Sequence, residues 1–131
     1  MSDLHPFEAP ELISTNEVRR STYIDYRTWG GTKWRAWRHG RSDFRHAPDG
    51  DESRAHLDDH IKYLTWSYGR WSAKWDGDIF DHYPADGGPG HGDTVLNYVG
   101  WLDRPNIEYW QCYWDITDNM FVHTRYRPSL K

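Results

Sequence analysis

Two histidines, His56 and His60, have the spacing that most resembles a site for chemistry. They lie four positions apart in the segment HLDDH. On a helix this spacing would place both imidazoles on one face, where a metal ion could bridge them. The zinc-hydrolase motif HExxH has a glutamate after its first histidine to act as general base, and Leu57 stands there instead. We therefore keep a His56–His60 metal site as an alternative and predict no cofactor.

Four polar side chains near the C-terminus form a second candidate site, which would be catalytic. In a sheet, Tyr109 and Tyr113 would share an aromatic and polar face with His123 and Arg125 from the next strand. Histidine and tyrosine can exchange protons with a substrate. The sequence contains no nucleophile elbow, phosphate-binding loop or dinucleotide fingerprint. A small lyase, isomerase or hydrolase is therefore an alternative, and the sequence favours a protein that is not an enzyme.

The segment from Arg19 to Arg45 interleaves cations with indole rings. Nucleic-acid-binding proteins combine phosphate-neutralising cations with stacking rings in this way. The opposing interpretation is a solvated hairpin that faces the acidic remainder of the chain. Nucleic-acid binding is thus a third hypothesis. The candidate binding residues of this segment are Trp29, Trp34, Trp37, Arg35 and Arg38.

These candidates must be positioned by regular elements, and the strongest signals are for β-strands. Aromatic and β-branched residues flank Gly30–Gly31, and glycine can adopt the positive φ that a tight hairpin turn requires. The segments 94–102, 107–116 and 120–127 have the same composition and predict a three-stranded antiparallel meander. In the middle segment the face that carries Trp110 and Cys112 is the better core candidate.

Between the hairpin and the meander the pattern favours a helix. Apolar residues recur at helical spacings from Leu57 to Trp71, which predicts a helix over residues 51–67. A hairpin is the competing interpretation for 61–75, and the glycine-rich segment 76–93 predicts a loop. We find no internal repeat. The expected class is therefore α+β, with an N-terminal β-hairpin, one central helix and a C-terminal meander; an all-β barrel or sandwich is the alternative.

The 131 residues suffice for one domain, which we place at 19–131 after an extended arm at 1–18. The N-terminus lacks the basic start and apolar core of a signal peptide, and no apolar run is long enough to cross a membrane. The single cysteine, Cys112, cannot form an internal disulfide. The expected location is the cytoplasm or a virion.

Nine Trp and nine Tyr must supply much of the buried area. These residue types are enriched at protein–protein interfaces, and we expect some of the rings to contact another molecule. The arm would lie on a neighbouring subunit and bury Phe7 and Leu12. The leading hypothesis is therefore a non-enzymatic structural or assembly subunit that binds copies of itself or other proteins. A phage tail or head–tail component is its most concrete form.

Overall fold

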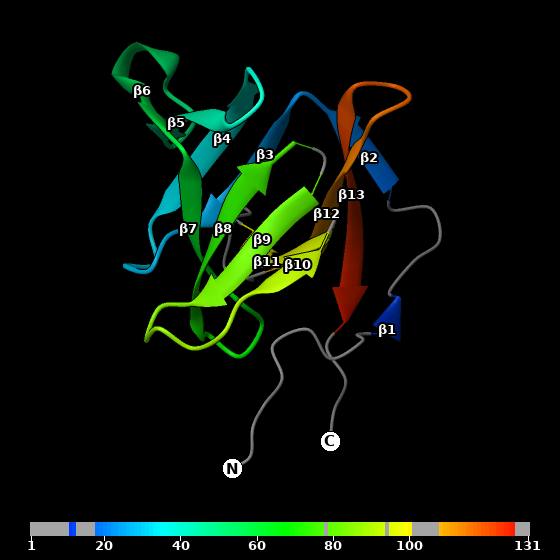
Figure 1. Cartoon of the computed structure of the whole chain (residues 1–131). Coiled ribbons are helices and arrows are strands. Elements are labelled where there is room, and N and C mark those ends of the chain that lie inside the picture. The colour runs from blue at the N-terminus through cyan, green and yellow to red at the C-terminus, as the bar shows by residue number, and fades with distance from the viewer. Residues whose placement is uncertain (1–10, 13–17, 78, 94, 101–107, 128–131) are drawn as a thin grey trace.

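Three antiparallel sheets make up the protein in a computed structural model, which describes residues 11–12, 18–77, 79–93, 95–100 and 108–127. The first sheet holds β3 (Tyr23–Arg27), β4 (Lys33–His39), β5 (Asp43–Pro48) and β6 (His56–Asp58). The second holds β7 (His60–Leu64), β8 (Arg70–Asp76), β9 (Ile79–Pro84) and β10 (His91–Asp93). The third holds β11 (Val95–Gly100), β12 (Glu108–Asp115) and β13 (Met120–Arg127), together with β1 (Glu11–Leu12) and β2 (Val18–Ser21), which both pair with β13 (Figure 1).

The predicted α+β class is wrong, because the described residues contain no α-helix and are nearly all β. The only helical element among them is the short 3-10 helix Glu52–Arg54. Residues 51–67 form β6 and β7, and along β7 the buried Ile61 and Tyr63 alternate with the exposed Lys62. That period of two is a strand period. The all-β alternative has the right strand content, and the strands are arranged in three antiparallel sheets.

Tyr68 explains why the helical spacing was misleading. Its φ of 63° places it in the turn between β7 and β8, with an exposed ring, so it cannot belong to an apolar helix face. The open question over residues 61–75 is thereby resolved as a hairpin. The predicted loop at 76–93 is also wrong, since it contains β9 and β10.

The predicted N-terminal hairpin and C-terminal meander are confirmed. Strands β3 and β4 pair across a turn in which Gly31 has a φ of 84°, while Gly30 does not enter the positive region. Strands β11, β12 and β13 form the meander, with Trp110 and Cys112 buried on the predicted face. Sequence alternation was therefore reliable wherever strands were long.

The strand register reveals an internal repeat that the sequence analysis missed. One row of paired residues runs across four strands in each sheet in the same way. The three rows are Ile24–Ala36–His46–His56, Ile61–Ala73–His82–His91 and Leu96–Cys112–His123–Arg19. A second row begins Tyr26–Trp34, Tyr63–Trp71 and Tyr98–Trp110 in the same three sheets. The chain is thus three copies of one four-stranded unit.

The three repeats close into a ring. Their first strands β3, β7 and β11 all contact one another, and the third strand of each repeat contacts the first strand of the next. The fourth place in the last repeat, beside β13, is taken by β2 from the N-terminal side (Figure 1). Because the chain closes the ring with its own N-terminal strand, repeat three is tied to repeat one.

The core lies between the sheets and is largely aromatic. Phe44, Phe80 and Phe121 occupy the equivalent position in the three repeats. All three are fully buried, and Phe80 stacks on both of the others. Within the described part of the chain, Tyr68 and Tyr113 are the only Trp or Tyr side chains that are exposed. Six of the 17 described Trp and Tyr side chains are buried and nine are half-buried, so a single protomer covers part, but not all, of the ring surface. Among the described residues, no helix has the length and apolar character needed to cross a membrane.

Candidate binding site

Each repeat contains a buried tyrosine–histidine pair on its first and third strands. The tyrosine hydroxyl lies 2.7–2.8 Å from the Nδ1 atom of the histidine in all three cases. The pairs are Tyr26–His46, Tyr63–His82 and Tyr98–His123. All six side chains are almost completely buried, so each pair satisfies polar groups that could not reach water.

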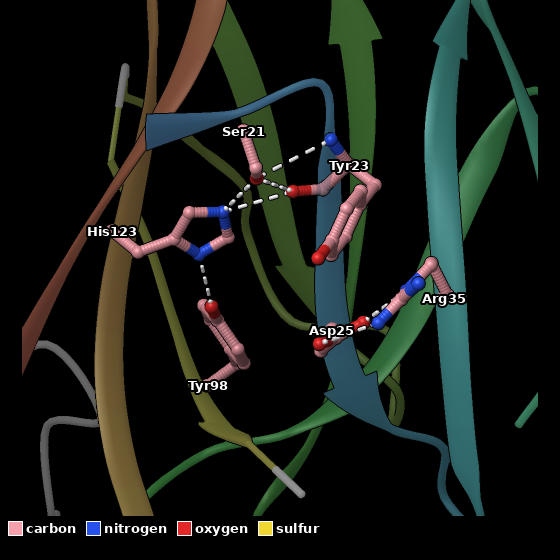
Figure 2. Close-up of polar contacts among 6 residues, drawn as sticks. All are labelled: Ser21, Tyr23, Asp25, Arg35, Tyr98 and His123. Carbon is pink, nitrogen blue, oxygen red and sulfur yellow. Dashed lines mark hydrogen bonds and ion pairs between the residues drawn. The ribbon is translucent and has the colours of Figure 1, made fainter. Parts of the chain in front are cut away.

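His123 shows what the second ring nitrogen does. Its Nε2 lies 2.8 Å from the backbone carbonyl of Tyr23, on the first strand of the first repeat (Figure 2). A carbonyl can only accept, so we assign the proton to Nε2, and Nδ1 then accepts from the Tyr98 hydroxyl. The imidazole therefore joins the third repeat to the first.

Ser21 also touches this imidazole, with its Oγ 2.8 Å from Nε2 (Figure 2). The arrangement resembles a serine–histidine pair, but its hydrogen bonds run the wrong way for a nucleophile. The Ser21 hydroxyl donates to the carbonyl of Tyr23, and Nε2 already carries a proton. Burial further lowers the pKa of His123 to about 4, which disfavours its protonated form. We conclude that this cluster is structural.

The fourth strand of each repeat supplies a side chain that covers the tryptophan of its second strand. In the first repeat His56 lies against Trp34, with ring centroids 5.5 Å apart. In the third repeat Arg19 takes the corresponding place, with its guanidinium 4.9 Å from the Trp110 ring. In the second repeat His91 lies 6.0 Å from Trp71, so the first two repeats cover the indole with an imidazole and the third covers it with a longer guanidinium.

A pocket of about 220 Å³ lies beside Trp34 and His56, between the first and second repeats. The indoles of Trp29 and Trp34 supply its apolar surface. Lys62, on β7, holds its ammonium group 5.0 Å from the Trp29 ring. The remaining lining residues are Tyr26, Thr28, Gly30, His46, His56, Asp58 and His60.

Asp58 and Asp59 orient the imidazole of His60 at the edge of this pocket. The Nδ1 atom of His60 lies 3.1 Å from Asp58 and 2.8 Å from Asp59. Two carboxylates on Nδ1 favour a proton there. The same three side chains bring one ligand atom each within 4.8 Å of one another, which is close enough to hold a metal ion. Exposed acidic groups commonly cluster without a metal, so this geometry alone assigns none.

His46 forms the buried wall of the pocket. Its ring stacks on His56 with centroids 5.6 Å apart, and its Nδ1 is paired with the Tyr26 hydroxyl. Burial lowers the pKa of His46 to about 4, and the charge of Asp58 only partly opposes this. The imidazole is therefore neutral at physiological pH.

The predicted site residues fall into separate places. Trp29 and Trp34 meet in the pocket, whereas Trp37 lies on the other face of β4 under Arg45. Arg35 forms an ion pair with Asp25 at 2.7 Å (Figure 2). Arg38 lies between two indoles at the opposite end of β4. Phe7 lies outside the described residues, and Leu12 belongs to β1.

His56 and His60 both reach the pocket, but not as a helical pair. They lie on β6 and β7, and the metal-compatible cluster contains only His60 of the two.

The structure does not assemble the predicted catalytic pocket. Cys112 is paired with His123 and Trp110 with Arg125, so both polar residues of β13 share the face of those two partners. Tyr109 and Tyr113 point to the other face of β12. Arg125 is bound to Glu108 at 2.8 Å. The expectation failed because the register pairs even-numbered residues of β12 with odd-numbered residues of β13. The odd-numbered His123 and Arg125 therefore share a face with Cys112 and Trp110, and not with Tyr109 and Tyr113.

Sequence reasoning missed Tyr26, His46 and Asp58 as pocket residues. The signal that could have found them is the internal repeat. Each repeat contains a tryptophan followed two positions later by alanine or cysteine, and then a phenylalanine followed two positions later by histidine. A comparison of the chain with family models, curated proteins and solved structures finds no match.

Proposed function

We propose that this chain is a non-enzymatic binding protein whose pocket at the first repeat junction holds a single sugar residue. The observation that carries the proposal is the convergence of two indoles with His56, Asp58, His60 and Lys62 around one small cavity. A concave site with apolar walls and a few convergent polar groups is the usual form of a small-ligand site.

The lining has the chemistry that a sugar ring requires. The apolar face of a pyranose packs on indole surfaces such as those of Trp29 and Trp34. Asp58 can accept hydrogen bonds from hydroxyl groups, and Lys62 can donate them. The volume of about 220 Å³ is below the 300–1,000 Å³ typical of drug-sized ligands, which supports a ligand of one ring.

Catalysis is less well supported than binding. The pocket has an oriented imidazole in His60, but its described lining contains no serine or cysteine nucleophile, and the Tyr26 hydroxyl is occupied by His46. The residues expected to form a catalytic pocket lie on different faces of the third sheet.

The assembly hypothesis and the nucleic-acid hypothesis both lose support. The first depended on aromatic rings that a single protomer could not enclose; two of the described Trp and Tyr side chains are exposed and nine are half-buried, and they form no single exposed cluster that would favour it over the pocket. The second depended on free cations between Arg19 and Arg45. Several of these cations are engaged within the protomer: Arg19 on Trp110, Arg20 with Asp115 and Asp118, Arg35 with Asp25, and Arg45 with Glu52.

The repeat itself supplies the variant that tests the proposal. His56→Arg introduces the arginine of the third junction at the first and should place a guanidinium over Trp34, which fills the pocket in exchange for the stacking of His56 on His46. We expect saturation-transfer NMR with a panel of monosaccharides to detect binding by the unmodified protein and none by the His56→Arg variant.

Trp37→Ala is the matched control, because it removes an indole from the other face of β4 and should leave binding unchanged. Trp34→Ala should abolish binding. The proposal fails if no monosaccharide binds, or if binding persists when the pocket is filled.

A further inference from the structure

A second pocket, of about 400 Å³, lies at the opposite end of the strands. It forms where the hairpins that join the second and third strands of the three repeats converge. Its described lining residues come from all three repeats: Arg38, Arg41, Gly77, Trp114, Ile116 and Asn119. Strand β4 separates it from the first pocket, since Trp34 is near the start of that strand and Arg38 near its end.

Arg38 breaks the repeat pattern at this end. Arg38 is the strand partner of Phe44. At the equivalent position, Trp75 is the partner of Phe80 in the second repeat, and Trp114 is the partner of Phe121 in the third. Two repeats therefore place an indole where the first places a guanidinium. The guanidinium carbon lies 4.5 Å from each of the two indole rings, and one amino group donates to the carbonyl of Gly77 at 3.2 Å. These contacts hold the charge in a fixed place.

The positive charge of this pocket is not balanced within it. Arg41 is the second cation, and none of the described lining residues is acidic. Asp115 and Asp118, which flank the same hairpin, are bound to Arg20 at 3.2 Å and 2.7 Å. Burial, and then repulsion from Arg41, lowers the pKa of Arg38. Two like charges that face one cavity are stabilised by an anion between them.

We propose that this pocket binds an oxyanion, a phosphate or a carboxylate group, between Arg38 and Arg41, with the apolar part of the ligand against Trp114 and Ile116. Guanidinium groups suit such ligands because their planar donors match the oxygen geometry of both groups. Asn119, in the adjoining turn, adds a neutral donor. This site is independent of the sugar pocket, because the two share no lining residue.

The test is an NMR titration with inorganic phosphate and, separately, with acetate, at fixed ionic strength and pH 7. We expect saturable shifts of the Trp114 indole and Asn119 amide signals. Arg41→Gln should weaken binding by about tenfold or more, because it removes a charge-assisted hydrogen bond. Arg41 is exposed, so this variant should fold normally, whereas Arg38 is packed between indoles.

Arg70→Gln is the control, since it removes an equally exposed charge from the start of β8 and should leave the affinity unchanged. Saturation with only one of the two anions would identify which oxyanion the pocket prefers. Shifts that do not saturate with either anion, or equal weakening by Arg41→Gln and Arg70→Gln, would overturn the proposal. A monosaccharide titration leaves these signals unmoved if the two sites are separate.

Discussion

Acidification should destabilise this protein through its buried histidines. His46 and His123 have pKa values lowered to about 4 from 6.5, chiefly by burial. Between pH 6.5 and pH 4 these two imidazoles are therefore mostly neutral in the native state and mostly protonated in the unfolded chain. Since the folded pKa is depressed, stability is fully present above pH 6.5 and is lost progressively as pH falls towards 4.

The size of the effect follows from these two values. At pH 5 an unfolded histidine is almost fully protonated, whereas a native one with a pKa of about 4 is roughly one-tenth protonated. Relative to pH 7, this difference costs about 2 kcal/mol for each histidine, or about 4 kcal/mol for the two. That is a large part of the 5–15 kcal/mol by which domains are usually stable.

Urea unfolding followed by tryptophan fluorescence, at pH 7 and pH 5, measures this loss directly. Most carboxylates remain ionised throughout that window, so the histidines dominate it. His46→Gln keeps an acceptor for Tyr26 and should halve the pH effect, whereas His39→Gln, at an exposed site, should leave it whole. A change below about 1 kcal/mol in the unmodified protein, or an undiminished effect in His46→Gln, would refute the reasoning.

Two further predictions concern the third repeat. Tyr98→Phe should destabilise the protein by about 1–3 kcal/mol, because it leaves Nδ1 of His123 buried and unpaired. Tyr113→Phe, at an exposed ring, should change the free energy of unfolding by less than about 0.5 kcal/mol, and equal losses in the two variants would contradict the role of the pair. Cys112 is fully buried and its pKa is raised well above the usual value, so a thiol reagent should modify it only in urea. Rapid modification of the native protein at pH 7 would show that this part of the core opens.

Local sequence signals were sufficient where one strand face is buried and the turn is marked. Gly30–Gly31 located the first hairpin, and the alternation around Trp110 and Cys112 predicted the core face of β12. The same reasoning failed for residues 51–67, because β6 and β7 are short and one turn between strands happens to carry Tyr68 at a helical spacing. A period of two and a period of 3.6 are difficult to distinguish over five residues.

The repeat escaped detection because its connections differ in length. Trp34 follows Tyr26, and Trp71 follows Tyr63, by eight positions, but Trp110 follows Tyr98 by twelve. The fourth strand of the last repeat also comes from the other end of the chain, so Arg19 cannot be recognised as the counterpart of His56 from the order of residues. The pocket is lined by residues of two repeats and depends on how these repeats meet, so it was beyond prediction.

Residue type alone determined much of this protein: an aromatic core, strands at both ends and no internal disulfide. Strand pairing across long sequence separations decided the rest. It joined His123 to Tyr23, a hundred residues apart, and brought together Trp34, His56 and His60. Which face a side chain occupies depends on register, and a shift of one residue reverses it. The pairing of His123 with Cys112, and not with Tyr113, depends on the register of β13 between β12 and β2, which local sequence does not determine.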